Sequence, residues 1–401
     1  MGRGTVKILV LTFYYRPDLS AGSFRTTVLV TSLLAAAPAG STIDVVTTLP
    51  NRYRSFSAVA SEIERDGAVT VHRVALPAHK SGMQDQSKAF LTFARAAIKL
   101  TRDKRYDVVF ATSSRLMTAA LGAWISRRVQ GRLYLDIRDI FVDTISDVAP
   151  RAIAWAVKPF LSIVERWTVA RADKVNLVSR GFAEYFSTRY PRQRFSYFTN
   201  GVDDEFLAHA VEADSCFPIA PGDAPLTAVY AGNIGESQGM HTILPELARR
   251  MEGRLRFRII GDGGRKPALA AALRLAGVTN VELLAPVARE ELIAAYRDAD
   301  VLFLHLNDHD AFKKVLPSKL FEYAAMGKPI WAGVSGYAAE FIGAEVTNAA
   351  VFAPCDVDGA ARAFDVLVLG YSRRTRFLER HARARISGEM ADDVVAVGQG
   401  R

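Results

Sequence analysis

Cysteine is scarce in this 401-residue sequence, which has only Cys216 and Cys355. So few and so distant cysteines exclude a disulfide framework and suit the reducing cytoplasm. No apolar run reaches the roughly 18 residues that a membrane-spanning helix needs, and the first residues carry no cleavable signal pattern. Histidine, cysteine and acidic residues form no cluster with metal-ligand spacing, so no metal site is predicted. The sequence therefore predicts a cytoplasmic protein, either soluble or peripheral to a membrane.

Positive charge is plentiful but unevenly distributed. Residues 1–200 hold 29 Lys+Arg against 15 Asp+Glu, a net of +14, whereas residues 201–401 hold 22 and 27, a net of −5; together they give the formal charge of +9. This asymmetry indicates that one half meets a polyanionic ligand or surface, of which nucleic acid and an anionic membrane are the obvious classes. The length exceeds one typical domain and favours two domains of about 200 residues.

Apolar, β-rich runs alternate with helical stretches along the whole chain. The strands expected are KILVLTF, TIDVVTT, VTVHRVA, DVVFATS, RLYLDIR and KVNLVS in the first half, and LTAVYAG, LRFRIIG, VELLAPV and VLFLHL in the second. Near-continuous Val/Ile/Leu strands that alternate with helices indicate parallel sheets covered on both faces. Two such sets predict an α/β protein with two Rossmann-like domains joined near FTNGVDDEF, with the ligand cleft between them at the carboxyl ends of the strands.

The segment VLPSKLFEYAAMGKPI (315–330) predicts a short helix with Pro317 at its first position and Gly327 as its C-terminal cap. Lys319 and the free N–H groups of the first turn would attract phosphate. Glu322 shares a face with Lys319 and could accept hydrogen bonds from sugar hydroxyls. The pattern indicates a ligand with phosphate at one end and ribose at the other; the alternative is an ordinary amphipathic helix in which Lys319 and Glu322 form a surface pair.

Glycine-containing loops follow three of the expected strands. Two come from the second half, Asn233 to Gly239 (NIGESQG) and Gly261 to Lys266 (GDGGRK), and one from the first, where Ser20 to Ser23 follows VLTFYYRP. Neither loop of the second half is a dinucleotide fingerprint, and no Walker lysine pattern is present. Their convergence with the helix of Lys319 on one cleft is what favours a binding site.

Four segments, AVYAGNIGESQGMHTILPEL, FRIIGDGGRKPAL, NVELLAPVAREELIAAYRDADVLFL and LPSKLFEYAAMGKPI, resemble in order and spacing the donor domain of glycosyltransferase family 4. KILVLTFYYRPDLSAGSFRT and TNGVDDEF fit the same family, and the branch is similar to bacterial O-antigen and capsule N-acetylfucosaminyl transferases. The resemblance implies a GT-B fold with an acceptor- and membrane-facing domain at 1–203, a nucleotide-sugar donor domain at 204–370, and a C-terminal helix, 371–401, that crosses back to the first domain.

The resemblance also assigns the donor site. Glu322 falls on the second glutamate of the family's Glu-x7-Glu motif, which binds the donor ribose, whereas the first falls on Lys314. The arginine and lysine that hold the diphosphate in many members fall on the uncharged Asn233 and Gln238, which implies that Lys319, with Arg265, supplies the missing charge. The donor-binding residues implied are Gly22, Asn233, Gly235, Gln238, Gly261, Asp262, Gly263, Arg265, Val287, Leu316, Pro317, Ser318, Lys319 and Glu322.

The reaction that the resemblance implies is retaining transfer of a sugar, an N-acetylated hexose or deoxyhexose, from a UDP-sugar to a polyprenyl-diphosphate-linked or glycan acceptor, with no cofactor or metal. Asp139 is expected to orient the acceptor hydroxyl, so the catalytic residues are Asp139, Lys319 and Glu322. The acceptor residues expected are Arg16, Arg25, Asp136 and Arg138. Alternatively, Asp136 and Asp139 are helix caps or partners of Arg138, and His305 and His309 are structural or contact the sugar.

Residues 86–105 predict that the basic half of the chain binds a membrane surface. Lys88, Arg95, Lys99 and Arg102 recur at offsets of 7, 11 and 14, on one stripe of a helix whose other faces carry Phe90 and Phe93. Such a helix suits the anionic inner face of the cytoplasmic membrane, although a solvent-facing stripe is the alternative. By contrast, core spacing predicts that another helix is structural, through Ile153, Val157, Phe160, Val164 and Trp167.

Three rival functions remain. A nucleic-acid-binding protein would use the basic half, but the sequence has no recognised reader motif, so no nucleic-acid partner is predicted. A nucleotide-sugar epimerase of similar fold would act on the UDP-sugar without an acceptor. A degenerate, non-catalytic member of the family would explain Lys314, Asn233 and Gln238.

Overall fold

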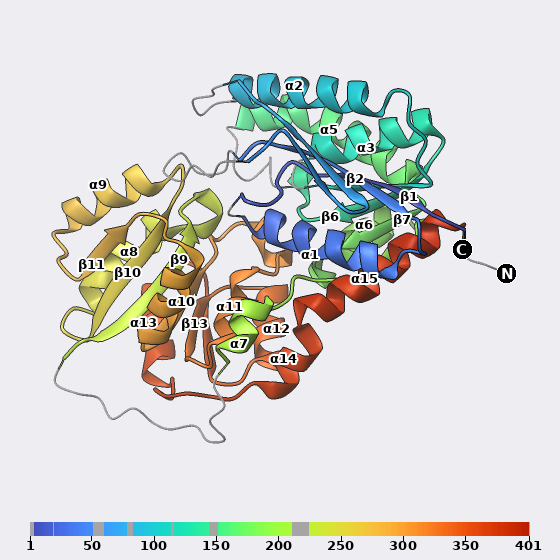
Figure 1. Cartoon of the computed structure of the whole chain (residues 1–401). Helices are drawn as coiled ribbons and strands as arrows, with labels where there is room; N and C mark the ends of the chain where they lie inside the picture. Colours follow the sequence, from blue (N-terminus) through green and yellow to red (C-terminus); the bar gives the residue numbers. More distant parts are fainter. Residues whose placement is uncertain are drawn as a thin grey trace. The chain divides into compact units, whose positions relative to one another are not determined.

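The computed structural model describes residues 4–18, 20–50, 60–77, 83–113, 116–143, 151–210 and 224–400 (Figure 1). The chain divides into two compact units: unit 1 is Met1–Asn200 with Arg383–Arg401, and unit 2 is Gly201–Ala382. Unit 1 ends at Asn200, three residues before the predicted end of the first domain at residue 203. The C-terminal segment that belongs to unit 1 begins at Arg383, whereas the prediction places its start at residue 371. Among the described residues, no helix is long and apolar enough to cross a membrane.

Unit 1 is built on an eight-stranded sheet in the order β3-β4-β2-β1-β5-β6-β7-β8, in which β3 alone runs antiparallel to its neighbour. Its strands are β1 (Lys7–Leu11), β2 (Thr42–Thr48), β3 (Ile63–Asp66), β4 (Val69–Val74), β5 (Val108–Thr112), β6 (Arg132–Ile137), β7 (Lys174–Leu177) and β8 (Phe195–Ser196). Its helices are α1 (Ala21–Ala36), α2 (Met83–Thr101), α3 (Leu116–Val129), α5 (Arg151–Arg171), α6 (Ala183–Arg189) and α15 (Arg383–Gly398).

The helices of unit 1 cover both faces of this sheet. α1 packs against α15 on one face, while α3 packs against both α2 and α5 on the other (Figure 1). The strands between them are buried on both sides, as β5 shows with five buried residues in a row. Continuous burial is why these strands read as uninterrupted apolar runs and not as alternating ones.

Unit 2 has a six-stranded, wholly parallel sheet in the order β11-β10-β9-β12-β13-β14. Its strands are β9 (Leu226–Asn233), β10 (Leu255–Asp262), β11 (Val281–Leu284), β12 (Val301–His305), β13 (Ile330–Gly333) and β14 (Ala349–Phe352). Its helices are α7 (Asp204–Ala208), α8 (Met240–Arg250), α9 (Lys266–Ala276), α10 (Arg289–Asp298), α11 (Lys319–Ala325), α12 (Tyr337–Glu345), α13 (Val357–Asp365) and α14 (Thr375–His381). Separate apolar cores fill the two faces. The prediction of two Rossmann-like α/β domains is thus confirmed.

Two local predictions need correction. Pro317 is not the first residue of its helix: α11 begins at Lys319, and the carbonyl of Pro317 instead accepts from the N–H of Leu320 at 3.2 Å, in a tight turn before the helix. Gly327 does end the helix as predicted, with φ of +67°. The apolar residues of α5 that are predicted to lie in the core do not all do so, since Phe160 and Trp167 are exposed. Helical periodicity shows that apolar residues share a face, but not whether anything covers that face.

Candidate functional site

Paired glycines bring a cation to the carboxyl ends of β9 and β10. Gly232 pairs with Gly261 in the strand register, and both have φ in the region that disfavours side chains, +139° and +152°. A Cβ on Gly261 would lie 1.9 Å from the carbonyl oxygen of Gly232, and a Cβ on Gly232 would lie 2.0 Å from Nζ of Lys319. Glycine at position 232 therefore makes the room that the Lys319 ammonium occupies, 4.9 Å from the ring centroid of Tyr230.

The loop after β9 is closed by its own uncharged side chains. Oε1 of Gln238 accepts hydrogen bonds from Nδ2 of Asn233 at 2.9 Å and from the backbone N–H of Gly235 at 3.1 Å. These bonds form the 3₁₀ turn η2 (Glu236–Gln238) that leads into α8. In the structure, the side chains of Asn233 and Gln238 therefore shape the loop.

The loop after β10 carries the second predicted cation. Oδ1 of Asp262 accepts from the backbone N–H of Gly263 at 2.8 Å, and Arg265 forms an ion pair with Glu236 of the neighbouring loop. The Nε2 atoms of His241 and His309 each lie 3.9 Å from a carboxylate oxygen of Glu236. Sequence reasoning missed Glu236, and its place in a strand-end loop is the signal that could have found it.

Glu322 lies one turn after the start of α11, in a network of charges within unit 2. Its side chain is 15% exposed, its Oε1 lies 3.6 Å from Nη1 of Arg289, and its Oε2 accepts from the hydroxyl of Tyr296 at 3.3 Å. Burial raises the pKa of Tyr296, so its hydroxyl keeps its proton and acts as a donor. The Glu322 carboxylate is thus fixed from two sides.

Arg289 is shared among three carboxylates. Besides Glu322 it pairs with Asp203 and Glu205, and its guanidinium lies 4.4 Å from the ring centroid of Phe206. Burial alone would lower the pKa of Arg289, but Glu322 and Asp203 outweigh it and the pKa is raised, so the side chain stays charged. Sequence reasoning missed Arg289, although it directly follows the strand end LLAPVA, where a cation is informative.

A second buried arginine holds the other end of α11. Arg374 donates to the carbonyls of Ala324 at 3.2 Å and Lys328 at 2.9 Å, and to those of Thr347 and Asn348. It therefore ties the end of α11 to the segments that precede β13 and β14. The remaining predicted donor residues flank this helix: Leu316 is buried in the core, and Val287, Pro317 and Ser318 are partly buried.

His305 is a structural residue and not a sugar contact. It is fully buried, and burial lowers its pKa to about 4, so the ring is neutral. Nδ1 donates to the carbonyl of Gln238 at 2.7 Å, and Nε2 accepts from the N–H of Cys355 at 3.0 Å. The ring thereby ties the loop after β9 to the segment after β14.

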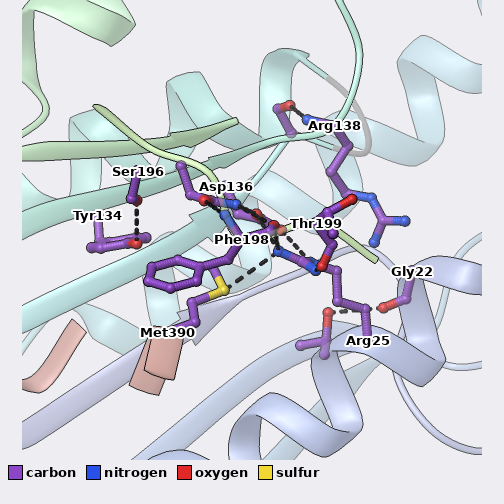
Figure 2. Close-up of polar contacts among 12 residues, drawn as sticks. Gly22, Arg25, Tyr134, Asp136, Arg138, Ser196, Phe198, Thr199 and Met390 are labelled. Carbon is purple, nitrogen blue, oxygen red and sulfur yellow. Dashed lines mark hydrogen bonds and ion pairs between the residues drawn. The ribbon is translucent and has the colours of Figure 1, made fainter. Parts of the chain in front are cut away.

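In unit 1 the structure joins two of the predicted acceptor residues to each other. Arg25 and Asp136 form a buried two-pronged ion pair, with Nε–Oδ2 and Nη2–Oδ1 both at 3.1 Å (Figure 2). Burial raises the pKa of Asp136, but the adjacent Arg25 more than offsets this and the pKa is lowered. Arg25 also donates to the carbonyls of Phe198 and Thr199, so its charge stabilises the interior of unit 1.

Arg138 and Gly22 do lie together, whereas Arg16 lies elsewhere. A Cβ on Gly22 would stand 3.4 Å from Nη1 of Arg138, and Figure 2 shows the guanidinium of Arg138 extending toward the loop of Gly22. Burial lowers the pKa of Arg138 to about 10, opposed by Asp136. Arg16 is held at the sheet edge by Glu64 of β3, at 2.9 Å.

Asp139 follows Arg138 at the end of β6. The surrounding protein raises the pKa of Asp139 to about 6, with Arg138 opposing, yet the residue is exposed, so water stabilises the charged form and limits the shift. A carboxylate that is accessible to solvent can orient a hydroxyl or accept its proton.

The comparisons with known proteins cover both units. Residues 27–201 match the model of the glycosyl transferase 4-like domain, and residues 225–369 match that of the glycosyl transferases group 1. A putative colanic acid biosynthesis glycosyl transferase, WcaI of Escherichia coli K12, is 25% identical over 339 residues, which is 80% of this chain and 82% of that protein.

Two solved structures have the same architecture. WaaG, a glycosyltransferase involved in lipopolysaccharide biosynthesis, superposes with a TM-score of 0.59 at 12% identity, over 98% of both chains. HepE from Anabaena, in complex with UDP-glucose, superposes with a TM-score of 0.61 at 14% identity, again over 98% of both chains. These likenesses confirm the fold class that the sequence predicts.

Proposed function

We propose, from the premise that this chain belongs to the GT-B glycosyltransferases of the family 4 type, that it transfers a hexose from a UDP-sugar to a lipid-linked or glycan acceptor in the synthesis of a bacterial surface polysaccharide. The relatives named in connection with colanic acid and lipopolysaccharide support the acceptor class. HepE, solved with UDP-glucose, supports the donor class. The sugar we propose is an N-acetylated hexose or deoxyhexose.

The observation that carries the proposal is the position of Lys319 and Glu322 one turn apart on α11. The Lys319 ammonium packs on Gly232 at the end of β9, and Glu322 is held one turn later by Arg289 and Tyr296. A diphosphate bound at Lys319 and a ribose whose hydroxyls donate to Glu322 would use both charges of the helix. Arg265 would add a second cation once its pairing with Glu236 is exchanged for phosphate.

Catalysis in this proposal is mainly electrostatic. The bond from the sugar to the diphosphate breaks with retention of configuration, and fixed cations stabilise the charge that develops on the leaving group. Asp139, exposed and close to Arg138, orients the acceptor hydroxyl, and Gly22 leaves room for a ligand beside Arg138. The diphosphate is held by side chains, and no metal is required.

Calorimetric titration with UDP and with GDP, with and without Mg²⁺, tests the donor site. Binding of UDP without metal, abolished in Glu322→Ala and retained in Glu340→Ala on the neighbouring α12, is the expected result. Wild-type protein that binds neither nucleotide would favour the degenerate member, and turnover of a UDP-sugar to its epimer without an acceptor would favour the epimerase.

We further propose that the chain acts at the inner face of the cytoplasmic membrane, with the cations of residues 86–105 directed to anionic lipid. On α2, Lys88, Arg95 and Lys99 are exposed, which supports the proposal. The aromatic residues predicted for this segment offer little to a membrane, because Phe93 lies fully buried against Phe13 and Phe90 is partly buried. α2 thus offers charge to a membrane, and Leu91 is its exposed large apolar side chain.

A further inference from the structure

The exposed face of α5 carries a concentration of large apolar side chains. Trp155 is 83% exposed, Ile163 68%, Phe160 57% and Trp167 40%. Phe160, Ile163 and Trp167 are spaced by three and seven residues, which places them on one face of the helix. The buried side of α5 is a different one, where Glu165 accepts hydrogen bonds from two tyrosines.

The neighbouring helix α3 extends this apolar surface. Trp124 is exposed on α3, with the guanidinium of Arg128 at 5.4 Å from its ring centroid. α3 packs against α5, so the two helices form one layer over the sheet (Figure 1). Among the residues that the structure describes, every exposed tryptophan or phenylalanine lies on α3 or α5. We call Trp124, Trp155, Phe160, Ile163 and Trp167 the aromatic face.

The exposed charges on the described parts of α2, α3 and α5 have one sign. The exposed cations on the layer formed by α2, α3 and α5 are Lys88, Arg95, Lys99, Arg127, Arg128, Lys158 and Arg166. In the described part of these three helices the acidic side chains are Asp85, which is partly buried, and Glu165, which is buried. The layer therefore presents aromatic side chains and positive charge together.

We propose that the aromatic face binds the headgroup region of an anionic lipid bilayer. Tryptophan favours this region because its ring is apolar and its N–H can still meet polar groups, and lysine and arginine are attracted to the anionic leaflet. A patch of this kind left in water is costly and marks a contact surface. Among the described residues of α2, α3 and α5 the exposed charges are all cationic, which matches lipid phosphate better than the mixed charges of a folded partner.

This inference rests on the proposed function in one respect, since a polyprenyl-linked acceptor would lie in such a bilayer. It also differs from the proposal that the cations of residues 86–105 face anionic lipid. Here α2 supplies only part of the charge, and the apolar contact comes from α5. In this proposal, α5 and α3 make the apolar contact with the bilayer.

Flotation with vesicles tests the inference on the full chain. The vesicles are phosphatidylcholine alone and phosphatidylcholine mixed with an equal amount of phosphatidylglycerol. Wild type should float only with the mixed vesicles. The triple variant Trp155→Gln, Phe160→Gln, Ile163→Gln and the double variant Lys158→Glu, Arg166→Glu should each lose binding by at least about tenfold. The control is Arg274→Glu with Leu275→Gln, since both residues are exposed on α9 of unit 2.

Fluorescence places the contact. Lipids with a bromine quencher in the upper acyl chain should quench the exposed tryptophans of the aromatic face in the wild type. Trp155→Phe should lose the share of that quenching that Trp155 contributes, while the variant still floats. The buried Trp331 supplies an unquenched background.

The inference is overturned if the wild type does not float with anionic vesicles, or if the variants float as well as the wild type. It is also overturned if the wild type does not bind vesicles but self-associates, and the triple variant abolishes that self-association. A second copy of the chain would then be the partner of the aromatic face. UDP titration of the same variants keeps the two proposals separate, because loss of flotation with normal UDP affinity leaves the donor site intact.

Discussion

Nη1 of Arg289 lies 3.6 Å from Oε1 of Glu322, which joins the first residue of α10 to the proposed ribose-binding carboxylate. The same guanidinium pairs with Asp203 and Glu205 near the domain joint. Its removal would take the shared cation from two largely buried carboxylates, Asp203 and Glu322, and from the exposed Glu205. Arg289 is therefore a positioning residue, acting through Glu322.

Arg289→Gln should weaken UDP binding by about tenfold and lower the free energy of unfolding by about 2 kcal/mol, the cost of lost hydrogen bonds to charged groups. Titration with UDP and denaturant unfolding measure the two effects. Arg297→Gln, exposed on the same helix, is the matched control and should change neither. If Arg289→Gln destabilises the protein but binds UDP normally, the arginine has no part in positioning Glu322.

Lys319→Ala should reduce UDP affinity by about tenfold or more and leave uridine affinity nearly unchanged, because a charge-assisted contact to phosphate is lost while the ribose contact remains. Calorimetry with both ligands measures the difference. Lys313→Ala is a suitable control, since its ammonium pairs with Asp310 on the surface. Equal losses for UDP and uridine would indicate that Lys319 supports the helix and not the diphosphate.

Gly232→Ala should displace the Lys319 ammonium, because the added Cβ would lie 2.0 Å from Nζ. We expect UDP affinity to fall and uridine affinity to hold, as for the lysine variant. Gly253→Ala is the control, because Gly253 also has a positive φ, +75°, but its Cβ would meet nothing within 4 Å. A Gly232 variant that behaves like the Gly253 variant in UDP titration would show that the close approach has no role in binding.

These relationships differ in how far the sequence predicts them. Glu322 and Lys319 are visible because a proline, a glycine and helical spacing lie within one short segment. The pairing of Arg25 with Asp136 is not, since 111 residues separate them and only the folded sheet brings α1 to β6. The exposed apolar residues on α5 are predictable only in part. Their helical spacing is evident in the sequence, but their burial depends on which neighbouring helices cover them.

Asp136→Asn should lower the free energy of unfolding by about 3–5 kcal/mol, because it leaves the Arg25 guanidinium buried without its carboxylate. The lowered pKa of Asp136 also predicts pH dependence: this stabilisation is present above the unfolded-state pKa and is lost as pH falls through the folded-state pKa. Lys104→Ala, which breaks an exposed pair with Asp44, should cost under about 1 kcal/mol. Similar losses in both variants would contradict a structural role for the buried pair.

His305 should make unit 2 sensitive to mild acid. The unfolded side chain takes up a proton near its usual pKa of about 6.5, whereas the buried ring has a pKa of about 4. Between these values the unfolded state binds more protons, so the free energy of unfolding should decrease as pH falls from 6.5 to 4, by up to about 3 kcal/mol at the lower end. His305→Gln keeps a donor and an acceptor without a titrating ring, so its loss of stability over this range should be smaller. Denaturant titrations of both proteins across the range measure the difference, and identical pH profiles would show that His305 is protonated as readily in the native state as in the unfolded chain.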